Sequence, residues 1–356
     1  MTFMENMEFN AGYWLSLPDH KAFEVFSGAA SSIKTSYRRL VQHWHPDRNP
    51  DPRAPQVLIR IQQLYRLARK GAPRPSSTVS VVHIKDNNGR VFRYQGHSVQ
   101  SFELGEVLFA NKSFAYHILP SHKNLFDRFI DRVSGFNYAT PQMRKSLSPL
   151  LPRLAGKVWG PDGGLIVLQR PRDFVSLRHL VEYYELRNPG SGLPAVHVAW
   201  ILSGVLNLAC YLDHQDLTHN AISPDSVWIN PQTHDVSLLG GWFFSHPSGS
   251  RIDLLPASSA TQASTRFLAE KTADKYFDLA LIRALGRELL GDPPGSRLAS
   301  MGQSPSMIEF LLSAANRSAV EEYRAWKQVL LATFGPPKFV PMNITSKDIY
   351  KENDNG

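Results

Sequence analysis

The 356-residue sequence has a single cysteine, Cys210, so no disulfide can form within the chain, which fits a reducing compartment. It also lacks a secretory signal pattern. Acidic residues Glu5 and Glu8 stand where a signal peptide carries basic residues, and no apolar run follows them. These two absences predict a cytoplasmic protein.

No apolar run is long enough to cross a bilayer. The most apolar stretch, residues 198–212, is interrupted by Ser203 and Asn207, whereas a membrane helix needs about 20 mainly apolar residues. We therefore expect residues 198–212 to form a buried helix, and we expect no membrane partner.

Acidic residues are outnumbered by basic ones, 31 against 39, which gives a formal net charge of +8. This excess of positive charge predicts an acidic partner surface. No nucleic-acid-binding motif accompanies it, so we favour a protein partner and do not expect nucleic acid.

What the chain does have is an amphipathic helix over about residues 31–44, which Ser31 or Ser32 can cap. Its apolar stripe recurs at helical spacing and consists of Ile33, Tyr37, Leu40, Val41 and Trp44. Its other faces carry the basic or titratable residues Lys34, Arg38, Arg39 and His43. Pro46 ends this helix, because proline has no N–H to donate.

A second helix is predicted to begin at Pro55. Its apolar positions are Leu58, Ile61, Tyr65 and Ala68. Two such stripes joined by a short loop predict an antiparallel helical hairpin, which displays His45-Pro46-Asp47 at one end.

The order of these residues resembles the J domain of DnaJ-type co-chaperones over about residues 20–70. In that family, the basic helix and the His-Pro-Asp turn bind a DnaK-type heat-shock chaperone and stimulate its ATP hydrolysis. The resemblance implies that Lys34, Arg38, Arg39 and His43 meet an acidic surface of the chaperone, while Asp47 of the turn His45-Pro46-Asp47 pairs with an arginine. The plainer interpretation is a solvated basic face beside an ordinary turn.

The remaining sequence predicts an α+β multidomain protein. A short helix is expected at residues 21–26, a hairpin with strands at residues 79–84 and 90–94, and a further strand pair at residues 102–110 and 113–119. Residues 1–70 form the J domain with an N-terminal extension, residues 71–78 a linker, residues 79–335 a β-rich small lobe followed by a helical large lobe, and residues 336–356 a disordered tail. No glycine/phenylalanine-rich segment or paired-cysteine module follows the linker, so the chain is not a full DnaJ.

The second unit resembles protein kinases, over about residues 80–335. Residues 211–229 are similar to the catalytic-loop region, where His219 matches the His of His-Arg-Asp and Pro224 the loop proline. Residues 236–242 resemble the strand that leads into Asp-Phe-Gly, and residues 165–180 resemble the hinge between the lobes. The resemblance implies a bilobal kinase-like fold.

The departures from this pattern predict a catalytically inactive pseudokinase. Phosphoryl transfer needs a catalytic carboxylate and oxygen ligands for magnesium. The corresponding positions hold Ala221, Ser226 and Gly240, and the lysine position holds His117. We expect His219 to pack in the core, and we interpret Asp278 as a capping carboxylate rather than as a catalytic residue.

We therefore expect a co-chaperone that is not itself an enzyme. Its J domain would recruit a DnaK-type chaperone, and its pseudokinase domain would bind an unidentified client or location. No cofactor is predicted, and no metal either, since His43 and His45 have no further ligands nearby.

Two alternatives stay open. The first is an atypical kinase or nucleotide-binding protein with relocated acids, for which Asp213, Asp216 and Asp225 are candidates. The second is a nucleic-acid-binding or scaffold protein that uses the basic charge.

Overall fold

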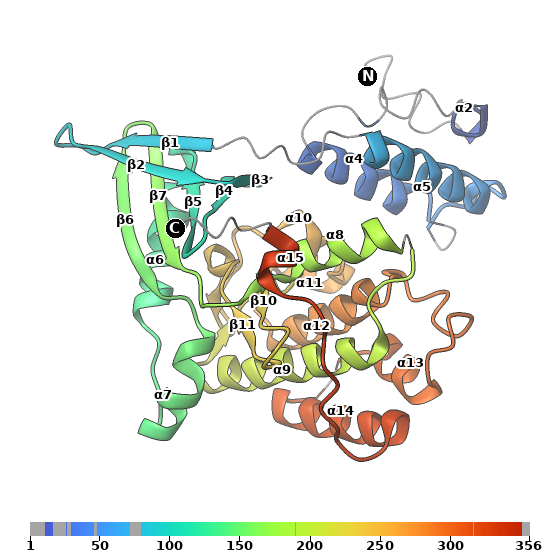
Figure 1. Cartoon of the computed structure of the whole chain (residues 1–356). Coiled ribbons are helices and arrows are strands. Elements are labelled where there is room, and N and C mark those ends of the chain that lie inside the picture. Colours follow the sequence, from blue (N-terminus) through green and yellow to red (C-terminus); the bar gives the residue numbers. More distant parts are fainter. Residues whose placement is uncertain are drawn as a thin grey trace.

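The computed structural model describes residues 11–16, 26, 30–45, 48–71, 80–188, 190–315 and 317–350. It combines a β-sheet region with a helical region, which agrees with the expected α+β class at this level (Figure 1).

Three helices precede the sheet: α2 (Ala11–Ser16), α4 (Ala30–His43) and α5 (Ala54–Gly71). Helices α4 and α5 pack against each other, and both expected helices on either side of His45 are present. Their shared core contains Leu40, Trp44 and Ile61, which are almost fully buried. Residues 46–47 lie outside the described part of the chain, as does the helix expected at residues 21–26 apart from Phe26.

A five-stranded antiparallel sheet has the order β3-β4-β5-β7-β6. Its strands are β3 (Ser98–Phe102), β4 (Gly105–Phe109), β5 (Ser113–Ile118), β6 (Leu154–Gly160) and β7 (Gly163–Gln169). The expected hairpin at residues 79–94 is also present, as β1 (Ser80–Lys85) and β2 (Val91–Gly96). It covers one face of the sheet, where Ile84 packs against Ala115 and Leu165.

The strand pair expected at residues 102–110 and 113–119 is present as β4 and β5, but β4 begins only at Gly105 and Phe102 belongs to β3. Phe102 pairs directly with Gly105, so strands β3 and β4 are joined by a tight turn at Glu103-Leu104. Gly105 has a φ of +148°, and a Cβ there would lie 2.1 Å from the carbonyl oxygen of His117. Only glycine fits this backbone, which explains why the chain reverses at this point.

The helical region follows the order seen in Figure 1. Its main helices are α6 (Lys123–Ser134), α7 (Pro141–Leu147), α8 (Leu177–Arg187), α9 (Ala195–His214), α11 (Thr265–Glu270), α12 (Lys275–Leu289), α13 (Pro305–Leu312) and α14 (Ala319–Phe334). A small sheet joins β8 (Val175–Ser176), β10 (Val227–Ile229) and β11 (Val236–Leu238), and β9 (Leu217–Thr218) pairs with β12 (His246–Pro247). One hydrophobic core extends from the inner face of the five-stranded sheet into this region.

Helix α9 is the buried helix expected from residues 198–212, and it is longer than expected. By length and composition alone, its 20 residues would suffice to cross a membrane. However, it packs against α12 and α14, and most of its apolar side chains, among them Val205 and Leu206, are buried within the protein. These contacts are those of a core helix.

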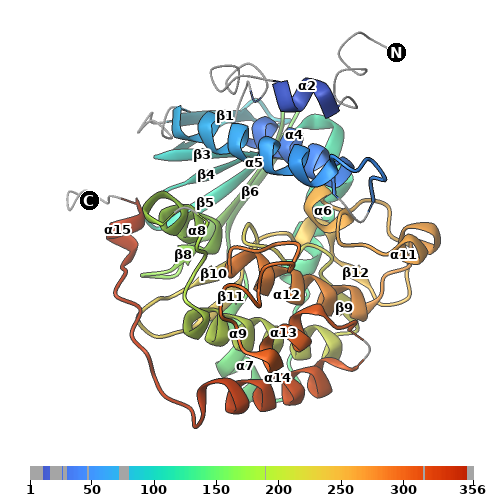
Figure 2. The same cartoon turned by 90° about the vertical axis from the view of Figure 1, so that its right-hand side faces the viewer.

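The disorder expected for the tail is wrong for residues 336–350. Met342 and Ile344 are buried to 1% and 6% exposure, and the short helix α15 (Ser346–Tyr350) lies beside α8 (Figure 2). The polar composition of this stretch concealed two apolar anchors, which hold it on the body.

Candidate functional site

The first candidate site is the turn after α4. Arg39 is exposed, Arg38 and His43 are half-buried, and Lys34 lies in the same helix with a side chain outside the described part. The carbonyl of His45 accepts hydrogen bonds from the N–H groups of Arg48 and Asn49, both at 2.9 Å.

The turn is also fastened to the helix. The side-chain amide of Asn49 donates to the carbonyl of His43 at 3.1 Å, and Asn49 accepts from the N–H of Asp51 at 3.0 Å. These hydrogen bonds hold residues 48–51 close to the C-terminal end of α4, on the path of the chain towards α5.

The second candidate site lies where the five-stranded sheet meets the helical region. His219, Ala221, Ser226 and Gly240 all lie there, and each is buried or nearly so. Sequence reasoning thus selected positions that the fold brings together from two separate segments.

His219 lies in the core, as expected. Its Nε2 is 2.9 Å from the carbonyl oxygen of Gly240, and its ring meets Trp242 edge-on at 4.9 Å. Burial lowers the pKa of this imidazole to about 3, against the opposing effect of the Gly240 hydrogen bond. His219 is therefore neutral at physiological pH, and its role is to join two segments of the core.

Asp278 holds the same loop through its backbone. Its two carboxylate oxygens accept hydrogen bonds from the N–H groups of His219 at 2.6 Å and Asn220 at 2.7 Å. Burial raises the pKa of this carboxyl to about 7, although both hydrogen bonds lower it. Asp278 thus caps backbone donors, whereas the N-cap of α12 itself is Asp274.

Position 240 has no room for a carboxylate. A Cβ added to Gly240 would lie 2.7 Å from the hydroxyl oxygen of Tyr116 and 3.0 Å from the carbonyl oxygen of Asp225. Ser226 is turned into its own loop, where its hydroxyl donates to the Ser223 carbonyl at 3.1 Å. Neither position offers an oxygen ligand to a metal ion in this arrangement.

Tyr116, rather than His117, faces positions 240 and 241. Side chains alternate along a strand, so these two neighbours on β5 point to opposite faces of the sheet. His117 lies on the far face, with its Nδ1 3.9 Å from a carboxylate oxygen of Glu106. His117, which the sequence places at the lysine position of the kinase-like pattern, therefore does not face positions 240 and 241.

Aromatic side chains fill the space between sheet and helices. Phe243 contacts Phe102, Tyr116 and Phe129, with ring centroids 4.5 to 5.8 Å apart. Further along β5, Phe114 stacks on Trp228 at 4.7 Å. Burial raises the pKa of Tyr116, and the charge of Asp225 raises it further. The interior of this junction is consequently apolar.

An ion-pair network closes the edge of the junction. Arg178 of α8 donates to both carboxylate oxygens of Asp225, at 2.8 and 2.9 Å, and to Glu288 at 3.1 Å. Gln100 of β3 also donates to Asp225, at 2.9 Å. Asp225 is therefore engaged in linking the sheet to the helices.

The other acids considered for a relocated site lie elsewhere. Asp213 accepts from Lys275 at 3.1 Å, and Asp216 has a left-handed backbone with a φ of +52° after α9. Within the part of the chain that is described, no group of three or more His, Cys, Asp or Glu side chains could hold a metal ion.

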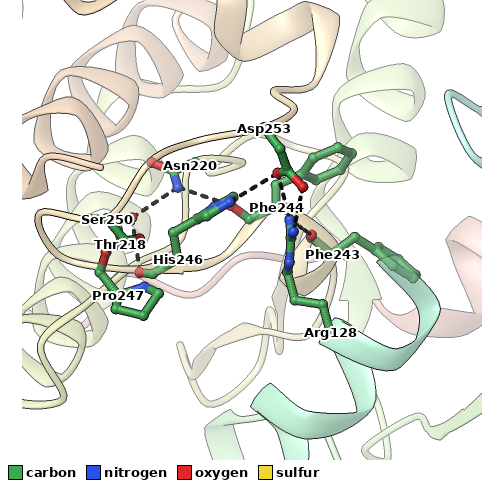
Figure 3. Close-up of polar contacts among 9 residues, drawn as sticks. All are labelled: Arg128, Thr218, Asn220, Phe243, Phe244, His246, Pro247, Ser250 and Asp253. Carbon is green, nitrogen blue, oxygen red and sulfur yellow. Dashed lines mark hydrogen bonds and ion pairs between the residues drawn. The ribbon is translucent and has the colours of Figure 1, made fainter. Parts of the chain in front are cut away.

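A further polar cluster, missed by sequence reasoning, ties α6 to the segment after β12. Figure 3 shows Arg128 reaching Asp253, whose carboxylate it contacts at 2.9 Å. His246 places Nε2 3.0 Å from Asp253 and Nδ1 2.8 Å from the Phe244 carbonyl. The hydrogen bond from Arg128 lowers the pKa of Asp253 to about 2.

Comparison with known proteins adds no assignment. Neither the scan against protein-family models nor the search of curated proteins finds a match to this chain.

Proposed function

We propose that this chain is a co-chaperone, with an N-terminal J-type helical hairpin that stimulates a DnaK-type chaperone and a kinase-like body that binds its client without phosphoryl transfer. The observation that carries the proposal is the order along the chain of a basic helix, His45-Pro46-Asp47 and a second helix. In the kinase-like body, the junction of sheet and helices has no metal ligands at positions 226 and 240.

The packing of α4 against α5 supports the proposal of a J-type helical hairpin. The ring of Tyr37 stacks on that of Tyr65 at 3.8 Å, and Trp44 is buried at the end of α4. Buried aromatic contacts fix α4 and α5 against each other, and the side chain of Arg39 adds an exposed positive charge to α4, which favours an acidic partner surface. Exposed ion pairs contribute only about 0–1 kcal/mol each, which suits fast and reversible docking.

The filled junction supports the proposal that the kinase-like body binds a client without phosphoryl transfer. Phe114 and Trp228 are buried against each other, and Gly240 cannot be replaced by a magnesium-binding acid without displacing Tyr116. A junction that is filled by apolar side chains and closed by an ion-pair network favours a binding or scaffolding role for residues 80–350 over phosphoryl transfer.

The test is ATP turnover by a DnaK-type chaperone with the full chain, comparing wild type with His45→Gln. We expect stimulation by wild type and its loss in the variant, with no change in melting temperature. The matched control is His83→Gln, at an exposed position on β1. Absence of stimulation by the wild-type chain would refute the co-chaperone proposal.

A charge test separates specific docking from general attraction. We expect Arg39→Glu to weaken the stimulation of the chaperone's ATPase and to reduce the salt dependence of that stimulation. The control is Arg93→Glu, which makes the same charge change at an exposed position of β2. Equal effects of the two variants would indicate net charge alone.

A further inference from the structure

Residues 336–350, here called the strap, contact the body at three separated places. Phe339 stacks on His234 at 4.2 Å, and His234 in turn stacks on Trp200 at 4.3 Å with nearly parallel rings. Next along the strap come the two buried anchors Met342 and Ile344. The strap therefore crosses the body as a largely extended segment, and it ends beside α8 (Figure 2).

The middle of the strap is held through its main chain. The side-chain amide of Gln232, in the connection between β10 and β11, donates to the carbonyls of Met342 at 3.1 Å and Ile344 at 2.9 Å. Bonds to main-chain carbonyls do not depend on the identity of the side chains. Any extended segment with apolar side chains two residues apart could satisfy them.

The end of the strap fits a polar and aromatic notch. The hydroxyl of Tyr350 accepts from the N–H of Ser176 at 2.8 Å and lies 3.2 Å from Nδ1 of His179. The guanidinium of Arg170 lies 4.1 Å from the centre of the Tyr350 ring. An aromatic ring with a hydroxyl acceptor is the group that matches these three partners.

This notch is connected to the filled junction. The ring of His179 meets Tyr350 edge-on at 5.3 Å and meets Phe109 of β4 at 4.6 Å. Ser176 pairs with Trp228, which stacks on Phe114. The residues that line the notch, His179 and Ser176, are thus also in contact with residues at the junction of sheet and helices.

We propose that the strap occupies, in cis, a docking groove for an extended polypeptide segment of another protein. The groove is formed by Trp200, Gln232 and His234 at one end and by Arg170, Ser176 and His179 at the other. The incoming segment carries two apolar side chains two residues apart, followed six residues later by a tyrosine. It competes with the strap, so its apparent affinity equals its intrinsic affinity multiplied by the fraction of time that the groove is free of the strap.

This inference rests on the proposed client-binding role only for the identity of the partner as a client. The experiment uses a fluorescein-labelled peptide of residues 336–350 as the probe, measured by anisotropy against the full chain without any chaperone. Chaperone stimulation without peptide binding would overturn the groove alone, and peptide binding without stimulation would overturn the co-chaperone proposal alone.

The release variant is Met342→Asp/Ile344→Asp, which removes the strap's anchors and leaves the groove intact. We expect it to bind the probe at least about tenfold more tightly than wild type. Adding Gln232→Ala should weaken that binding again. The matched control, Val320→Asp/Leu331→Asp, introduces the same charges at exposed positions of α14 and should behave as wild type.

Hydrogen exchange of residues 336–350 shows whether the strap has left. Faster exchange there, with unchanged exchange in α9, together with probe binding, supports the proposal. Faster exchange without probe binding overturns it, and so does unchanged exchange, because the strap is then an integral part of the fold. If the release variant loses its cooperative melt, Phe339→Ala/Tyr350→Ala is judged by the same criteria.

Discussion

Asp278 and His219 are two buried titratable residues in contact, and their effects on stability oppose each other. Burial raises the pKa of Asp278 from 3.8 to about 7, so its contribution is fully present below pH 3.8 and is lost as pH rises through about 7. Burial lowers the pKa of His219 from 6.5 to about 3, so its contribution is present above pH 6.5 and is lost as pH falls towards 3.

We expect these two contributions to offset each other between about pH 4 and 6.5 in the wild-type protein. In Asp278→Asn only the histidine contribution remains, so the free energy of unfolding should rise with pH more steeply than in wild type. In His219→Phe it should fall with pH. Urea denaturation across this pH range measures both slopes, and an Asn variant with the wild-type slope would contradict the assignment.

At the same scale, the sequence identified His219, Ala221, Ser226 and Gly240 because they occur at fixed distances within short segments. Tyr116 escaped because its importance depends on the face of β5 that it occupies. A shift of one residue reverses every side chain of a strand. Residues 114–116 and those beside them fit the pattern of a buried strand, so the local pattern alone does not decide which side chains of β5 face positions 240 and 241.

At the scale of elements, a buried ion pair joins α12 to α14. Nε of Arg283 donates to Glu322 at 2.7 Å, and both side chains are at most 3% exposed. We expect Arg283→Met to lower the free energy of unfolding by about 3–5 kcal/mol, because the Glu322 carboxylate stays buried without its partner. The double variant Arg283→Met/Glu322→Leu should lose less, as measured by chemical denaturation. Equal losses would show that the pair itself is not the cause.

The contact between α6 and the segment after β12 rests on Arg128 and Asp253. We expect Arg128→Met to raise the pKa of Asp253 towards its ordinary value and to speed hydrogen exchange over residues 243–254. Because the Asp253 side chain is 46% exposed, the stability loss should be small, about 1 kcal/mol or less. Carboxyl NMR titration checks the pKa. Asp131→Asn, at an exposed position of α6, is the control and should change neither quantity.

The elements themselves were largely predictable from periodicity, and the misses have physical causes. The strand expected at residues 102–110 begins three residues late, at Gly105, because the chain reverses at residues 103–104. The composition of residues 336–356 predicts disorder because most of them are polar, charged or proline. Met342 and Ile344 are nevertheless buried, and Gln232, more than a hundred residues earlier, donates to the main-chain carbonyls of both; no local pattern carries that information.

At the scale of the whole molecule, the junction of sheet and helices decides whether a nucleotide can bind. We expect no specific stabilisation of the full chain by millimolar Mg-ATP, because aromatic side chains fill the junction and positions 226 and 240 offer no metal ligand. The measurement is sensitive, since a ligand at one hundred times its Kd would add about 2.7 kcal/mol to the free energy of unfolding.

The basic charge of the chain calls for a matched ligand control in that thermal-shift experiment. Tripolyphosphate with magnesium carries the same kind of charge without the base, so equal small shifts with both ligands indicate general anion binding to a protein of net charge +8. Phe114→Ala/Trp228→Ala opens space in the junction without supplying metal ligands, and we expect it to remain unresponsive to ATP. A rise in melting temperature with Mg-ATP alone, in the wild-type chain, would instead establish a nucleotide site and revive the kinase alternative.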